Sequence, residues 1–208
     1  MDTMFGWEVT LLEPTNFWDG VPDEISGNYH FYNIPITSNV TSKSSPLRII
    51  KDIATLDDFV AFKLDIDTPT VEIPIALEIV DNPDIAELID EFFFELHFNC
   101  AIMKGCWGAV PESVSGLKLD RITAMRLFQK YRNMGIRSHF WPWFLLNQHP
   151  FIRSESMGVW DRLDPASWVK ISDKLDGQPD NGVCSQLSWA CKILILKDAE
   201  FFSEICKM

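Results

Sequence analysis

Basic side chains are scarce in the first half of this 208-residue chain. Residues 1–100 carry 19 acidic side chains and only 4 basic ones, and the formal net charge of the whole chain is -12. A protein that binds the phosphate backbone of nucleic acids presents a basic surface, so we expect no nucleic-acid partner. The excess of acid is typical of a well-hydrated protein surface.

Signals for membranes, secretion and cross-linking are also missing. The sequence has no run of about 20 apolar residues that would span a membrane, and its start lacks the basic segment and apolar run of a secretory signal. We therefore expect a cytoplasmic protein with no membrane partner. The 5 cysteines form no Cys-x-x-Cys pair, which argues against a disulfide framework and against a structural zinc site.

The composition indicates a globular protein, since 47% of the residues are hydrophobic and 23% are charged. We divide the chain into an α/β domain over residues 1–150 and an irregular C-terminal extension over residues 151–208. Within that extension, the apolar segment 189–196 fits a strand or a buried helix equally well.

Apolar segments alternate with amphipathic ones, which predicts strands joined by helices in a parallel sheet. Residues 59–67 are the clearest strand, because they are apolar on both faces as in the centre of a parallel sheet. The other predicted strands are 4–12, 29–37, 91–98 and 136–143. The predicted helices are 46–54, a crossover over 71–89 interrupted at Pro74 and at Asn82-Pro83, and 117–134. Residues 16–27 are expected to be surface turns.

Parallel sheets bind ligands outside the carboxyl ends of their strands. The polar residues predicted at those ends are Glu8 or Glu13, Asn33, Asp65, Asp67, Glu95, His97 and His139.

Two of these strand ends resemble a known family. Residues 59–72, FVAFKLDIDTPTVE, and residues 89–98, IDEFFFELHF, look like the fourth strand, the following helix and the fifth strand of FkbM-type, S-adenosylmethionine-dependent methyltransferases. Lys63, Asp65 and Asp67 match the Lys-x-Asp-x-Glu-Gly pattern of that family, except that Asp67-Thr68 replaces Glu-Gly. Residues 5–8 and 29–37 resemble the second and third strands.

The resemblance implies a Rossmann-like, mostly parallel sheet and S-adenosylmethionine as cofactor. The methyl group would pass to an oxygen of a small molecule or glycan. By resemblance, Glu8, Asn33 and Asp65 are assigned to cofactor binding, with Glu8 on the ribose and Asn33 near the adenine. Asp67 and His97 are the candidate catalytic residues, and this assignment includes no metal ligand.

The family's first strand and glycine-rich turn have no counterpart, because Gly20 and Gly27 are isolated. We therefore expect an N-terminally truncated or degenerate relative. It would be catalytically active only if it can function without that turn. Such a truncation would leave a sheet edge open, and open edges favour self-association.

Two other classes of function stay open. One is a non-catalytic α/β module for binding or scaffolding, which the missing turn favours. The other is a metal-dependent enzyme that uses Asp65, Asp67, His97 and His139, because carboxylates and imidazoles are ligands of divalent metals.

Each candidate also has a structural interpretation. Lys63 and the two aspartates share a strand face by alternation, so they can simply pair. Glu72 fits a helix cap or, more simply, a solvated helix face. His97 and His139 fit buried structural histidines, Cys100 and Cys106 fit activated or inert thiols, and Trp107 belongs to a set of tryptophans that fit either a ligand pocket or core packing.

Overall fold

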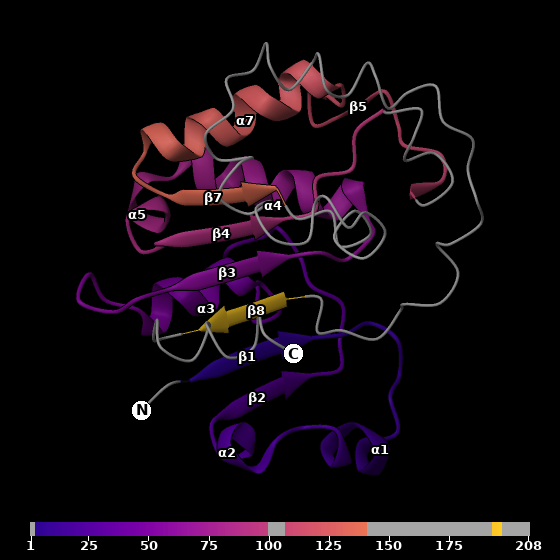
Figure 1. Cartoon of the computed structure of the whole chain (residues 1–208), viewed down its shortest axis with the longest axis vertical. Helices are drawn as coiled ribbons and strands as arrows, with labels where there is room; N and C mark the ends of the chain where they lie inside the picture. The colour runs from indigo at the N-terminus through magenta and orange to yellow at the C-terminus, as the bar shows by residue number, and fades with distance from the viewer. Residues whose placement is uncertain (1–2, 100–106, 141–192, 197–208) are drawn as a thin grey trace, which may run out of the picture.

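The computed structural model describes residues 3–99, 107–140 and 193–196, which form an α/β fold around a six-stranded sheet (Figure 1). The sheet strands are β1 (Met4–Trp7), β2 (Tyr29–Tyr32), β3 (Ala61–Leu64), β4 (Glu91–Phe94), β7 (Arg137–Phe140) and β8 (Ile193–Leu196). Their order across the sheet is β2-β1-β8-β3-β4-β7. The cysteines, the five tryptophans from residue 141 to residue 189, and most of residues 151–208 lie outside the described part.

Five of these strands point the same way, as the arrowheads in Figure 1 show. β1 pairs with β2, β3 with β4, and β4 with β7, all in parallel. Only β8 is antiparallel, and it lies between β1 and β3. The predicted mostly parallel sheet is therefore confirmed, and residues 193–196 of the ambiguous apolar segment are a strand.

The helices occupy the connections between the parallel strands. They are α1 (Pro14–Asp19), α2 (Asp23–Ser26), α3 (Pro46–Ile53), α4 (Pro69–Asp81), α5 (Pro83–Ala86) and α7 (Arg121–Asn133). The predicted surface location of 16–27 is confirmed, since α1 and α2 bury no residue, but two short helices replace most of the predicted turns. Among the described residues, no helix combines the length and the apolarity needed to cross a membrane.

The two faces of the sheet carry separate cores. Phe62, Phe92 and Phe94 point to one face, where α3, α4, α5 and α7 supply the larger apolar cluster. Ala61 and Phe93 point to the other face, in a smaller cluster flanked by side chains of α1 and α2. β3 is buried on both faces, which explains its continuous apolar sequence.

The connection from β3 to β4 differs from the prediction at Pro74. α4 continues through this proline and ends only before Asn82-Pro83. A proline inside a helix removes one hydrogen bond and costs about 3 kcal/mol. Buried Ile73, Ile75 and Ile79 lie on both sides of Pro74, so their packing against the sheet holds the helix together.

The predicted helix 117–134 begins later than expected. Leu117 and Lys118 form β6, which pairs with β5 (Ser113–Val114) across a turn whose residues Ser115 and Gly116 have φ of 50° and 79°. Two consecutive left-handed residues are typical of a tight hairpin turn. α7 then begins at Arg121, where the Thr123 N–H donates to the side chain of Asp120 at 2.8 Å.

The large core depends in part on one buried hydroxyl. The Tyr131 O–H donates to the Ala76 carbonyl at 2.8 Å and ties α7 to α4. We expect Tyr131→Phe to lower the free energy of unfolding by about 1 kcal/mol, because the hydrogen bond is lost while the ring stays packed. Tyr32→Phe is the control, since the Tyr32 hydroxyl has no hydrogen bond to any described residue. Urea unfolding would contradict this account if both variants shifted the midpoint equally.

Candidate functional site

The carboxyl ends of β3 and β4 lie side by side and place several acids at one edge of the sheet. Leu64 is paired with Phe94, and the Glu95 N–H donates to the Leu64 carbonyl at 3.1 Å. Asp67 therefore comes opposite His97, as predicted from the sequence. The His97 Nε2 atom lies 3.7 Å from Asp67 Oδ1.

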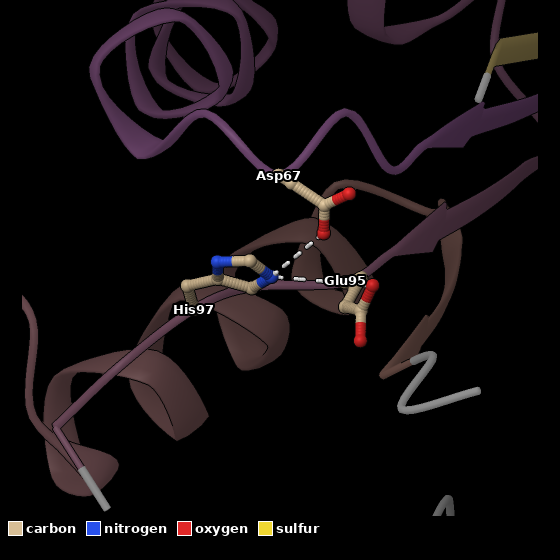
Figure 2. Close-up of side chains that lie close together, drawn as sticks. All are labelled: Asp67, Glu95 and His97. Carbon is tan, nitrogen blue, oxygen red and sulfur yellow. Dashed lines mark ion pairs between the residues drawn. The ribbon is translucent and has the colours of Figure 1, made fainter. Parts of the chain in front are cut away.

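Asp67, Glu95 and His97 form a compact group that we call the acid–imidazole cluster (Figure 2). One donor atom from each residue lies within 4.8 Å of the other two. His97 Nε2 is 4.0 Å from Glu95 Oε2, which is too long for a hydrogen bond. The imidazole nitrogen thus points between two carboxylates, as Figure 2 shows, and has no hydrogen-bond partner within the described structure.

Trp107 holds two members of this cluster in place. Its indole Nε1–H donates to Glu95 Oε1 at 3.3 Å, and its rings stack on His97 with centroids 4.9 Å apart and planes inclined by 23°. The stacking fixes the plane of the imidazole, while the hydrogen bond leaves Glu95 Oε2 facing His97. Sequence reasoning named Trp107 only as one of several tryptophans, because no local sequence pattern indicates its contact with Glu95.

Asp67 adopts a backbone conformation that is uncommon outside glycine. Its φ is 54°, in the left-handed region, where aspartate and asparagine are the better tolerated side chains. β3 ends at Leu64, so the alternation assumed for Asp65 and Asp67 does not extend to Asp67. The predicted pairing of Lys63 with Asp65 is present at 2.7 Å. Asp67 remains 59% exposed and faces both the cluster and solvent.

The burial of Glu72 differs from what the sequence led us to expect. The sequence favoured a solvated helix face, yet Glu72 is only 1% exposed, and its Oε1 accepts the Ile66 N–H at 2.8 Å. Burial raises the pKa of Glu72 from 4.5 to about 7, although the hydrogen bond from Ile66 and the charge of His97 oppose the shift. Its second oxygen has no hydrogen-bond partner within the described structure.

Burial and mutual charge also act on the cluster. Burial raises the pKa of the Glu95 carboxyl, and Asp65 adds to this rise while His97 opposes it. Burial alone would lower the pKa of His97, but Glu95, Glu72 and Asp67 outweigh it and raise that pKa. The edge therefore gathers more negative charge than Lys63 and His97 balance.

The structure does not bring His139 into this cluster. β7 pairs His139 with Phe93, two residues before Glu95, and the imidazole stacks on the Phe93 ring at 4.5 Å. Its Nε2 atom lies 3.9 Å from Glu91 Oε2, near the start of β4. The predicted convergence of two histidines at the carboxyl edge is therefore not found.

Glu8 and Asn33 follow β1 and β2 and shape a separate loop at the same edge. The Asn33 amide donates to the Glu8 and Thr10 carbonyls, both at 2.7 Å, and its Oδ1 accepts the Leu12 N–H at 2.8 Å. Glu8 Oε1 accepts the Thr10 N–H at 2.7 Å. Only β8 separates β1 from β3, so these two strands are about 10 Å apart at the usual strand spacing.

No protein-family model matches the chain, and no curated protein or solved structure shows a significant match to it. Its function is therefore inferred from the chemistry of this edge.

Removing the charge of Glu72 should stabilise the protein in a pH-dependent way. Because its folded pKa of about 7 exceeds the unfolded 4.5, the stability that protonated Glu72 confers is complete below about pH 4.5 and is lost as the pH rises through 7. Each unit of pKa shift corresponds to about 1.4 kcal/mol, so ionisation costs up to about 3 kcal/mol. Glu72→Gln should therefore raise the melting temperature at pH 8 and change it little at pH 4.5.

The control for this experiment is Glu87→Gln, which removes one charge from an exposed side chain. Parallel melting profiles of wild type and Glu72→Gln from pH 4.5 to pH 8 would show that Glu72 is not buried as described.

Proposed function

We propose that this chain is a Rossmann-like, methyltransferase-like protein that, if it is competent without the glycine-rich turn, transfers a methyl group from S-adenosylmethionine to an oxygen of a small molecule or glycan. The observation that carries the proposal is the meeting of Asp67, Glu95 and His97 at the carboxyl edge of two adjacent parallel strands. Ligands of open α/β sheets bind at this edge, close to the place where the strand order reverses.

The order of the strands supports the Rossmann-like part of the proposal. From β1 the chain moves outward to β2 on one side, whereas β3, β4 and β7 follow one another on the other side. The connecting helices divide accordingly, with α1 and α2 beside one core cluster and α3, α4 and α7 in the other. One departure is β8, which is antiparallel and lies between β1 and β3 at the reversal point.

The cofactor would lie across this reversal point. In the proposed complex, Glu8 binds the ribose hydroxyls with its half-exposed carboxylate, which now accepts only a local N–H. Asn33 has its amide and its carbonyl engaged by the loop, so it would shape the adenine side of the site rather than contact the base through these groups. Asp65 lies on the opposite side of the site, neutralised by Lys63.

Transfer of a methyl group requires mainly that donor and acceptor be aligned. Asp67 is the exposed member of the cluster, and His97 is the buried one that lies next to it. Together they offer a carboxylate and an imidazole nitrogen that can hold an acceptor hydroxyl. Glu8 and Asp67 follow strands that only β8 separates, so both lie at the carboxyl edge near the reversal point, where the cofactor is proposed to bind.

Titration of the full chain with S-adenosylmethionine tests the proposal. We expect saturable binding with a Kd below about 1 mM, and Glu8→Gln should weaken it by at least about 10-fold, because a hydrogen bond to a charged group is worth about 1.5 to 3 kcal/mol. Glu13→Gln, which changes an exposed acid at the start of α1, should leave the Kd unchanged. Equal affinity in all three proteins, or no saturable binding, would refute the proposed cofactor.

Methyl transfer to hydroxyl-containing small molecules and glycans is the second readout. Asp67→Asn should lower transfer from labelled S-adenosylmethionine while leaving cofactor affinity unchanged, because Asp67 is assigned to the acceptor. Loss of cofactor binding in this variant would contradict that assignment.

A further inference from the structure

The acid–imidazole cluster has the composition of a metal site. Asp67 and Glu95 offer carboxylate oxygens, His97 offers an imidazole nitrogen, and these three atoms lie within 4.8 Å of one another. Ligand atoms that each lie about 2.1 Å from a metal ion are about 3.0 to 3.4 Å apart. His97 Nε2 and Asp67 Oδ1 are already 3.7 Å apart, so small side-chain rotations would complete the site.

The buried imidazole is an independent sign of a ligand. His97 is only 4% exposed, and its Nε2 atom points between the two carboxylates without a hydrogen-bond partner in the described structure. A buried polar atom left unsatisfied costs about 1 to 3 kcal/mol. A cation bound to Nε2 would remove that cost.

Trp107 orients two members of the cluster in a way that suits cation binding. Trp107 fixes the plane of His97 by stacking and fixes Glu95 by donating to its other oxygen. Such outer contacts orient metal ligands in proteins. The ammonium of Lys63 is paired with Asp65 at 2.7 Å, outside the three residues of the cluster.

We infer that Asp67, Glu95 and His97 bind one divalent transition-metal ion, such as Mn²⁺ or Zn²⁺, through two carboxylate oxygens and one imidazole nitrogen. The imidazole disfavours Ca²⁺ and Mg²⁺, which prefer oxygen ligands only. This set differs from the one expected from the sequence, because Glu95 belongs to it whereas Asp65 and His139 do not.

Three protein ligands leave coordination positions open. Asp67 is 59% exposed, so these positions are reachable from solvent. An open position is a mark of catalytic rather than structural metal sites, because water or a substrate oxygen can occupy it. The metal site stands on the cluster alone. If the proposed methyl transfer also holds, the open position is where the acceptor hydroxyl would bind.

Metal binding by the full chain can be measured without any cofactor or acceptor. The protein is stripped with a chelator and titrated with Mn²⁺, whose free concentration is followed by electron paramagnetic resonance. Mn²⁺ is the chosen probe because it avoids soft thiolates, so the 5 cysteines do not compete. We expect one ion per chain, with a Kd at or below about 100 µM, and displacement by Zn²⁺.

Variants distinguish Mn²⁺ binding at this site from binding at other acidic surfaces. Asp67→Asn, at an exposed position, and His97→Asn should each weaken Mn²⁺ binding by at least about 10-fold. His139→Asn is the matched control, because this imidazole also faces a carboxylate, at 3.9 Å, yet lies outside the cluster. It should change the affinity by less than about 2-fold, well below the effect of losing a ligand.

Three results would overturn the inference. They are the absence of saturable binding of both Mn²⁺ and Zn²⁺, an affinity that Asp67→Asn does not change, and an equal loss in His139→Asn. If His97→Asn fails to fold by circular dichroism, Asp67→Asn decides the question. Because S-adenosylmethionine is not part of this test, its outcome is independent of the cofactor titration.

Discussion

β3 and β4 run parallel and side by side in the described sheet, and their register sets the level at which Asp65 and Glu95 leave it. Leu64 lies opposite Phe94, so the residues that follow each strand leave the sheet at the same level. Phe62, Phe92 and Phe94 pack under the helices on one face, while Ala61 and Phe93 are buried on the other. Shifting β4 by one residue would turn each of these side chains to the opposite face, which the two cores oppose. The chemistry of the edge therefore depends on the packing of the strands.

That register creates an electrostatic problem at the edge. Glu72 and Glu95 are removed from water, and burial raises the pKa of both carboxyls. A buried charge is tolerated when it is paired, when it is protonated or when it binds a cation. Lys63 pairs with Asp65, and His97 faces the remaining acids. A site that holds excess negative charge beside an orphaned imidazole nitrogen is suited to bind a cation or a polar substrate, and perturbed groups of this kind are enriched at functional sites.

Part of this arrangement could be predicted from the sequence. Residues 59–67 and 91–98 are apolar on both faces, which predicts two neighbouring parallel strands. Asp67 and His97 lie at the ends of these segments, so they were expected to be near each other. The burial of Glu72 could not be predicted, because an acid in the first turn of a helix looks the same whether it is solvated or folded back onto the preceding loop. His139 was misplaced because its position depends on the register of β7, which pairs it with Phe93 rather than with a residue at the edge. The predicted start of the helix at residue 117 was wrong, because a tight hairpin turn at Ser115-Gly116 precedes α7.

His97, and not His139, shares a site with Glu95. A double-mutant cycle in urea unfolding tests it most directly, with Glu95→Gln combined first with His97→Asn and then with His139→Asn. Residues in one charged network show coupling free energies of about 0.5 to 3 kcal/mol, whereas independent sites add within about 0.5 kcal/mol. The account predicts a coupling of at least about 1 kcal/mol for Glu95 with His97, and additivity for Glu95 with His139. Additivity in the first cycle, or coupling only in the second, would contradict it.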